Sequence, residues 1–152
     1  MIEYRKMSAE DVLQVAQLEK ECFSHPWSEK SIAGELTNPL SLWLVAATDA
    51  NVVGYVGSQS VMGEADMMNV AVSQEYRNRG VGRALISALI TVLKSQGVYC
   101  LTLEVRVSNE PAIHLYQSMG FAQIGRRPNY YAAPKEDALI LKKEWECENS
   151  CN

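Results

Sequence analysis

A glycine-rich turn between a strand-like segment and a long apolar helix pattern could bind a phosphorylated ligand. The strand-like segment contains Val70-Ala71-Val72, and the turn is Asn78-Arg79-Gly80-Val81-Gly82-Arg83. Glycine lacks the Cβ that would keep a ligand away from the backbone, and the start of a helix carries about half a positive charge. The turn therefore predicts a phosphate-binding site at a helix N-terminus.

Two further side chains could move protons. Glu104 lies in a strand-like segment, 101–105, where alternation places it on the face opposite Leu103 and Val105. Tyr116 lies on a predicted helix, seven residues after Asn109 and so on about the same face. A phenol with a reference pKa of about 10 is protonated at neutral pH and can donate a proton. The alternatives are a solvated strand residue for Glu104 and a core tyrosine for Tyr116.

The elements that must position these residues follow from hydrophobic periodicity and turn signals. Helices are expected near 8–22, 28–38, 82–96 and 108–120. Strands are expected near 2–5, 42–47, 52–61, 66–73, 99–105, 121–125 and 138–142, the second to fourth in antiparallel succession. The segment with Pro128, Asn129, Tyr130 and Tyr131 is expected to be a loop. This order predicts an α/β (α+β) fold with helices on both faces of a sheet.

Composition and charge indicate an ordinary globular protein. The 152 residues are 47% hydrophobic and 21% charged, which suggests a single domain over 1–145 and a polar tail, 146–152, that frays. The net charge of -4 does not favour direct nucleic-acid binding. No apolar run approaches the ~20 residues of a membrane helix, and no secretory signal is recognisable. We therefore expect a cytoplasmic protein without a membrane partner.

The cysteine and histidine residues indicate neither a disulfide framework nor a metal site. Cysteines stand at Cys22, Cys100, Cys147 and Cys151, with spacings that are typical of reduced thiols in the cytosol. His25 and His114 stand apart in the sequence, so we expect no bound metal.

The glycine turn and several other segments resemble the GNAT superfamily of acetyl-CoA-dependent N-acetyltransferases over nearly the whole chain. Arg77 to Gly82 is similar to the signature of Arg or Gln followed by x-x-Gly-x-Gly or Ala. Four further segments resemble the second half of the family's fold, namely 103–106, 108–109, 112–116 and 119–121. Four segments, 25–30, 103–106, 129–131 and 136–138, resemble the RimI-type branch, whose members acetylate the N-terminal alanine of the eighteenth small-subunit ribosomal protein.

The resemblance implies a mixed, mostly antiparallel central sheet of about seven strands and acetyl-CoA as co-substrate, without a metal. The amides of the turn from Asn78 to Arg83 would hold the CoA pyrophosphate. The backbone of Val70, Ala71 and Val72 would pair with the pantetheine arm. Asn109 would contact the same arm, although a helix cap explains an asparagine there equally well.

The resemblance also implies direct attack of an amine on the thioester. A peptide α-amino group has a reference pKa of about 7.7–8.0, so it must lose a proton before it attacks. Glu104 is the candidate general base, acting directly or through water, and Tyr116 is the candidate general acid for the CoA thiolate. None of the cysteines stands in a motif that suggests a nucleophile.

The acceptor that the resemblance implies is the N-terminus of a ribosomal protein. Loop aromatics could grip an extended chain end, and the candidates are Phe23, Trp27, Tyr130 and Tyr131. The sequence leaves open which acidic residue lines the groove, among Glu35, Glu64, Asp66 and Asp137. Two other functions stay open at this point. The chain could acetylate a small-molecule amine, or it could be a CoA-binding regulatory module without turnover.

Overall fold

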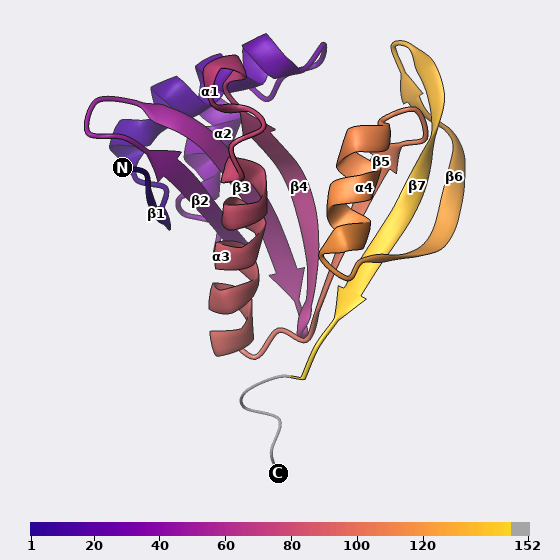
Figure 1. The fold of residues 1–152 in the computed structure, drawn as a ribbon. Coiled ribbons are helices and arrows are strands. Elements are labelled where there is room, and N and C mark those ends of the chain that lie inside the picture. The colour runs from indigo at the N-terminus through magenta and orange to yellow at the C-terminus, as the bar shows by residue number, and fades with distance from the viewer. Residues whose placement is uncertain (147–152) are drawn as a thin grey trace.

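The computed structural model describes residues 1–146, and Cys147 and Cys151 lie outside them. A single sheet carries helices on both faces (Figure 1). The helices are α1 (Val12–Cys22), α2 (Glu29–Glu35), α3 (Val81–Ser95) and α4 (Glu110–Ser118). The strands are β1 (Glu3–Lys6), β2 (Ser41–Ala47), β3 (Val52–Val61), β4 (Glu64–Val72), β5 (Cys100–Arg106), β6 (Ala122–Ala132) and β7 (Lys135–Glu144). Short 3-10 turns precede α1 and follow β4.

The sheet contains seven strands in the order β1-β2-β3-β4-β5-β7-β6. Neighbours are antiparallel except β4 and β5, which run parallel. The parallel pairing covers only Glu64–Asp66 and Cys100–Thr102, and beyond it the two strands diverge (Figure 1). The mixed, mostly antiparallel seven-stranded sheet expected from the sequence is confirmed. Its divergence leaves the facing backbone edges of β4 and β5 without a strand partner.

Alternating side chains build a core on each face of the sheet. On one face α3 buries Leu85, Leu89 and Leu93 against the strands, and α4 adds Tyr116. On the other face α1 and α2 cover residues that include Trp43, Val45 and Tyr55. Because β2 alternates between the two cores, a shift of one residue in its register would turn both sets of side chains to the wrong face.

The expected helix ends are confirmed where the local chemistry decides them. The Ser28 hydroxyl accepts a hydrogen bond of 3.0 Å from the Ser31 amide at the start of α2. Oδ1 of Asn109 accepts from the Ala112 amide at 3.3 Å, so this asparagine caps α4. Gly97 and Gly120 adopt positive φ just beyond α3 and α4, as glycines do at helix C-termini.

The last two strands are longer than the sequence predicts. The expected loop around Pro128 and Asn129 lies within β6, which pairs with β7 as far as Ala132 and Lys135. The prediction of a loop here was wrong because β6 is the edge strand, where the missing N–H of a proline removes no ladder hydrogen bond. A register irregularity between Arg127 and Tyr131 absorbs the positive φ of Asn129. The outcome is a long β6–β7 hairpin.

A β-bulge distorts β4 beside the divergence. Gly57 of β3 pairs with Asn69 and the next residue, Ser58, pairs with Met67, so Met68 is the extra residue. A Cβ on Gly57 would lie 2.4 Å from the Trp43 ring, so only glycine fits opposite the bulge. Bulges re-aim side chains near functional sites. In the described part of the chain, no helix is long and apolar enough to span a membrane.

Candidate active site

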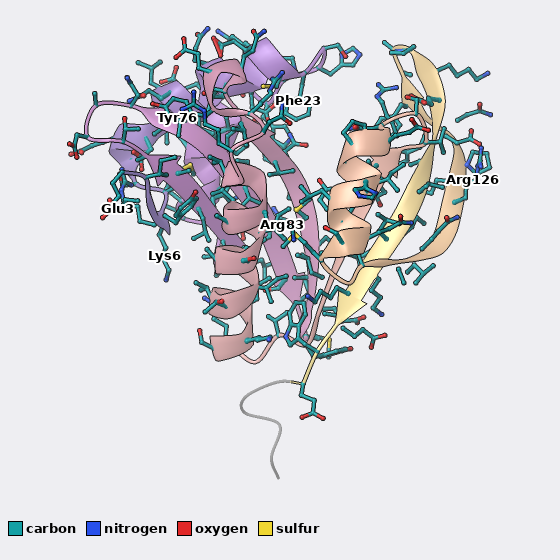
Figure 2. All side chains as sticks on the ribbon, viewed as in Figure 1. Glu3, Lys6, Phe23, Tyr76, Arg83 and Arg126 are labelled. Carbon is teal, nitrogen blue, oxygen red and sulfur yellow. The ribbon has the colours of Figure 1, made fainter. Side chains whose placement is uncertain are left out.

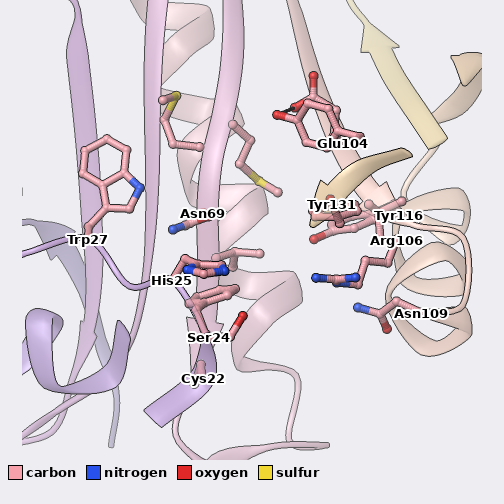
Figure 3. Close-up of a pocket in the computed structure, with 16 residues that line it drawn as sticks. Cys22, Ser24, His25, Trp27, Asn69, Glu104, Arg106, Asn109, Tyr116 and Tyr131 are labelled. Atoms are coloured by element: carbon pink, nitrogen blue, oxygen red, sulfur yellow. Dashed lines mark hydrogen bonds between the residues drawn. The ribbon is translucent and has the colours of Figure 1, made fainter. Parts of the chain in front are cut away.

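A cavity of about 500 Å³ opens where β4 and β5 diverge (Figure 3). One wall comes from the segment between α1 and α2, and the other from β5, α4 and the β6–β7 hairpin. Its lining includes both predicted catalytic residues, Glu104 and Tyr116, together with Val70 and Asn109 from the predicted cofactor-binding set. The fold therefore brings together residues that are separated by up to 46 positions in the sequence.

The glycine turn presents unpaired amides at the start of α3. Asn78 and Gly80 have positive φ values of 63° and 81°, and the first helical hydrogen bond runs from the Ala84 amide to the Gly80 carbonyl. The amides from Asn78 to Arg83 make no hydrogen bond within residues 1–146. A Cβ on Gly80 would meet no atom within 4 Å. The turn is thus an open array of donors at the positive end of a fifteen-residue helix.

Three arginines surround this turn without a carboxylate partner among the described residues. Arg77 Nε donates to the Val72 carbonyl at 3.1 Å, and the Arg79 guanidinium lies over the Tyr76 ring at 5.2 Å. Arg83 lies between α3 and α4, where its Nη2 donates to the Ser118 hydroxyl at 2.7 Å (Figure 2). Their charges are available to a polyanion that approaches the amides.

The predicted cofactor strand divides between the two faces of the sheet. Val70 lines the cavity and packs, like Val72, on the α3 face, whereas Ala71 is buried on the face that α1 covers. Only their backbone could serve a ligand between β4 and β5, and that backbone edge has no strand partner. Such an edge can add an extended ligand by main-chain hydrogen bonds.

Glu104 projects into the cavity from β5, with Leu103 and Val105 buried on the opposite face. Oε2 accepts a hydrogen bond of 3.3 Å from the Tyr130 hydroxyl, and Oε1 lies 3.5 Å from Nε of Arg127. The Glu104 side chain is 29% exposed, so its carboxylate is held by two neighbours and is still accessible from the cavity. This is neither a freely solvated strand residue nor a closed ion pair.

Tyr116 is buried in α4 and packs edge-on against Phe121 at 5.8 Å. Its hydroxyl makes no hydrogen bond to the described residues, although every fully buried polar side-chain atom among them has a partner. The hydroxyl therefore opens into the cavity that Tyr116 lines. Burial raises the pKa of this phenol to about 12, so it is protonated at neutral pH. Tyr116 is both a packing residue and an available proton donor.

The comparisons with known proteins decide the family. The model of the acetyltransferase (GNAT) family matches residues 12–121, which span β4, the glycine turn, Glu104 and Tyr116. The chain belongs to the GNAT acetyltransferase family. The family membership expected from the sequence is confirmed, and the chain is an acetyltransferase.

Individual relatives match this acetyltransferase over nearly its whole length. It is 40% identical over 138 residues to a ribosomal protein bS18-alanine N-acetyltransferase of Salmonella typhimurium, covering 89% of this chain and 92% of the relative. The crystal structure of the ribosomal-protein-S18-alanine N-acetyltransferase from Escherichia coli is similar, with a TM-score of 0.87, 34% identity and 98% of each chain covered. Arabidopsis thaliana NAA60 in complex with acetyl-CoA shares the fold at a TM-score of 0.84 and 18% identity, over 95% of this chain and 98% of NAA60.

Aromatic residues line the cavity of this acetyltransferase from both walls. Phe23 and Trp27 come from the segment after α1, and Tyr130 and Tyr131 come from β6. The two tyrosine rings meet edge-on at 5.0 Å. The four aromatic residues expected at the groove are thus brought together, whereas none of the four acidic candidates lines it. Glu35 accepts hydrogen bonds from Ser41, Trp43 and Gln59 instead, and Asp137 accepts from Arg126 and the Asn129 amide.

The cavity is also lined by residues for which the sequence predicts no role. Arg106 donates to the Pro134 carbonyl at 2.8 Å and to Glu136 at 3.2 Å, and it lies over the Tyr131 ring at 4.2 Å. It therefore fixes the end of the β6–β7 hairpin beside Glu104. Asn69 reaches the cavity from the β4 bulge, which has no recognisable sequence signal. His25 is the one histidine among the described residues that line the cavity. Within residues 1–146, no three His, Cys, Asp or Glu side chains lie close enough together to hold a metal ion.

Proposed function

We propose that this enzyme transfers the acetyl group of acetyl-CoA to the N-terminal α-amino group of a protein. The acceptor of first choice is the N-terminal alanine of the eighteenth small-subunit ribosomal protein. The observation that carries the proposal is the cavity between β4 and β5, because Glu104 and Tyr116 both face it and its two aromatic walls leave an open groove. The names of the Salmonella and Escherichia coli relatives support the choice of acceptor.

Acetyl-CoA would lie along the divergence of the strands. The amides of Asn78 to Arg83 would bind its pyrophosphate, with Arg77, Arg79 and Arg83 balancing the charge. The free backbone edge of Val70, Ala71 and Val72 would bind the pantetheine arm, and Asn109 would contact the same arm from the cap of α4. This arrangement delivers the thioester to the cavity.

Glu104 removes a proton from the α-ammonium group, and the neutral amine attacks the thioester carbon. The C–N bond forms and the carbonyl oxygen takes up negative charge, which a backbone N–H of β4 stabilises. The nitrogen, which becomes cationic on attack, loses its second proton to solvent, the C–S bond breaks, and Tyr116 gives its proton to the departing thiolate sulfur. Tyr116 regains a proton from solvent as Glu104 releases one. This proposed route needs neither a covalent acyl-enzyme nor a metal.

The test compares acceptors that differ only in the reacting amine. A short peptide with a free N-terminal alanine should release CoA from acetyl-CoA, whereas the same peptide with a blocked N-terminus should not. A panel of small amines tests the small-molecule alternative. Acetyl-CoA binding in calorimetry without CoA release from any peptide or amine would contradict the proposal and favour a regulatory binding module.

We also propose that residues 1–145 form one acetyltransferase domain. The reaction is placed in the cytoplasm, where newly made ribosomal proteins present their N-termini. Limited proteolysis should leave one resistant fragment that contains both hydrophobic cores, and early cleavage within either core would contradict a single domain.

A further inference from the structure

Glu19 of α1 is a completely buried carboxylate without a cationic partner. Its side chain is 0% exposed, and no Lys or Arg of the described residues forms an ion pair with it. Oε1 instead accepts hydrogen bonds from the Tyr55 hydroxyl, at 2.7 Å, and from Nδ2 of Asn69. Oε2 accepts from the Trp27 amide at 3.3 Å. Burying a charge is costly, so three converging donors indicate a site with a purpose beyond packing.

The Glu19 carboxylate determines which way the Asn69 amide points. A carboxylate can only accept, so the NH₂ end of Asn69 must face it. The oxygen Oδ1 then lies at the opposite end of the amide. It makes no hydrogen bond to the described residues, where every fully buried polar side-chain atom has a partner, so Oδ1 is open to the cavity. Figure 3 shows Asn69 beside His25 and Trp27, across the cavity from Glu104 and Tyr131.

We propose that Oδ1 of Asn69 accepts an N–H of the acceptor's α-amino group and that Glu19 is the positioning residue that aims it. The inference rests on the proposed function. An acceptor oxygen on β4 and the carboxylate of Glu104 on β5 would hold the amine from two sides. The lone pair of the amine nitrogen is thereby directed at the thioester, which in the proposed function lies between β4 and β5. Orientation of this kind is a large part of catalysis by proximity.

The Glu19 carboxylate also fixes the cavity wall that the segment between α1 and α2 forms. Through its bond to the Trp27 amide, Glu19 holds the segment between α1 and α2, and the Trp27 ring packs edge-on against Trp43 at 5.5 Å. Trp43 in turn stacks on Tyr55 at 5.8 Å. One buried group therefore ties the groove wall and the amine acceptor to the same rigid core.

The decisive variant is Glu19→Gln, which changes the hydrogen-bond polarity and almost nothing in volume. A glutamine that keeps its oxygen on the Trp27 amide presents NH₂ to Asn69. The Asn69 amide must then flip, which puts a donor where the cavity had an acceptor. We expect KM for the alanine peptide to rise by about tenfold, the loss of one hydrogen bond to a charged group. KM for acetyl-CoA should stay unchanged.

A second substitution should restore the acceptor. In the double variant Glu19→Gln, Asn69→Asp, the glutamine NH₂ donates to one oxygen of the introduced carboxylate, whose other oxygen again faces the cavity. The Tyr55 hydroxyl, which donates to Glu19 in the wild type, can rotate and accept a hydrogen bond from the same glutamine NH₂. We expect KM for the peptide to return to within about threefold of the wild-type value, because residue 19 now supplies the donor and residue 69 the acceptor of the same hydrogen bond.

Two further variants separate positioning from stability. Tyr55→Phe removes one hydrogen bond from the same carboxylate without touching the cavity, so it should lower the melting temperature and leave KM for the peptide unchanged. Asn69→Ala removes the acceptor and one donor to Glu19 but leaves the bonds from Tyr55 and the Trp27 amide in place, so it should raise KM for the peptide even if Glu19→Gln fails to fold.

The outcomes distinguish this inference from the function on which it rests. A wild-type enzyme inactive on the alanine peptide would overturn both. With an active wild type, an unchanged KM for the peptide in Asn69→Ala would overturn only the role of Asn69. A double variant no better than Glu19→Gln would overturn the positioning role of Glu19.

Discussion

The Tyr130 hydroxyl on β6 donates a hydrogen bond of 3.3 Å to Oε2 of Glu104 on β5. Arg127, from the same edge strand, lies 3.5 Å from the other oxygen of that carboxylate. The β6–β7 hairpin therefore does more than close the groove, because it also orients the group that we assign as the base. Any change that moves the hairpin should act on the reaction as well as on peptide binding.

Glu104→Gln should abolish most of the turnover while leaving the co-substrate bound. Loss of a general base costs about 10²–10⁴-fold in rate, so kcat should fall within that range and the Kd for acetyl-CoA should stay constant. Steady-state kinetics and calorimetry measure the two quantities. Glu144→Gln, an exposed change at the end of β7, is the matched control. An unchanged kcat in Glu104→Gln would remove this residue from the mechanism.

Tyr116→Phe should lower kcat without unfolding the protein, because the lost hydroxyl opens into the cavity and the ring stays packed on Phe121. Since burial raises the pKa of Tyr116 to about 12, its proton is retained through neutral and moderately alkaline pH and is lost only as pH rises through that value. Wild-type kcat should therefore show no alkaline fall from this group up to about pH 10. Tyr99→Phe, outside the cavity, is the control. A wild-type kcat in Tyr116→Phe would reduce this tyrosine to a packing role.

Gly80→Ala tests the phosphate-binding turn. The added Cβ meets no protein atom, but it would occupy the space through which a pyrophosphate must approach. We expect acetyl-CoA to bind at least about tenfold more weakly, which corresponds to ~1.4 kcal/mol. The positive φ costs a further 1–2 kcal/mol of stability, roughly, in any L-residue. Gly120→Ala carries a similar backbone cost at φ 95°, away from the turn, and should leave the Kd for acetyl-CoA unchanged.

The ion pair between Arg5 and Asp11 should make stability sensitive to acid. Arg5 Nη1 lies 2.7 Å from Oδ2 of Asp11, which is buried, and this hydrogen bond lowers the pKa of that carboxyl. Because the folded-state pKa is depressed, the stabilisation is present above the unfolded pKa of about 3.9 and is lost as pH falls through the folded value.

The corresponding variant is Asp11→Asn. At pH 7 it should lower the free energy of unfolding by about 1–3 kcal/mol, and the difference from wild type should shrink as pH drops below about 4. Thermal unfolding across this pH range measures the effect. Glu10→Gln, at an exposed neighbouring residue, is the control and should show no pH-dependent difference from wild type in the free energy of unfolding. If the difference between Asp11→Asn and wild type were the same at all pH values, the role of the ion pair would be contradicted.

The fold was predictable where local chemistry and periodicity agree. The apolar pattern of α3, the Ser28 and Asn109 caps and the glycines after α3 and α4 each act within a few residues, so the sequence reveals them. The two strands of the β6–β7 hairpin were predicted but their length was not, because Pro128 and Asn129 are turn residues in most settings. Only the tertiary position of β6 at the sheet edge makes a proline tolerable there.

The site was predictable to the extent that it rests on motif residues. Glu104, Tyr116 and the glycine turn stand in recognisable segments, and the fold brings Glu104 and Tyr116 to one cavity. Glu19 and Asn69 carry no such signal. Glu19 is one polar residue in an amphipathic helix, and Asn69 reaches the cavity only because Met68 bulges from β4. Contacts between distant elements decide both positions.

The proposed reaction is direct acetylation of a protein α-amino group. It can be followed by mass spectrometry of the eighteenth small-subunit ribosomal protein after incubation with this enzyme and isotope-labelled acetyl-CoA. We predict that one labelled acetyl group is found on the N-terminal alanine and that the Glu104→Gln enzyme leaves that alanine unlabelled. Label confined to lysine side chains, or no label on a protein with a free N-terminal alanine, would contradict the account.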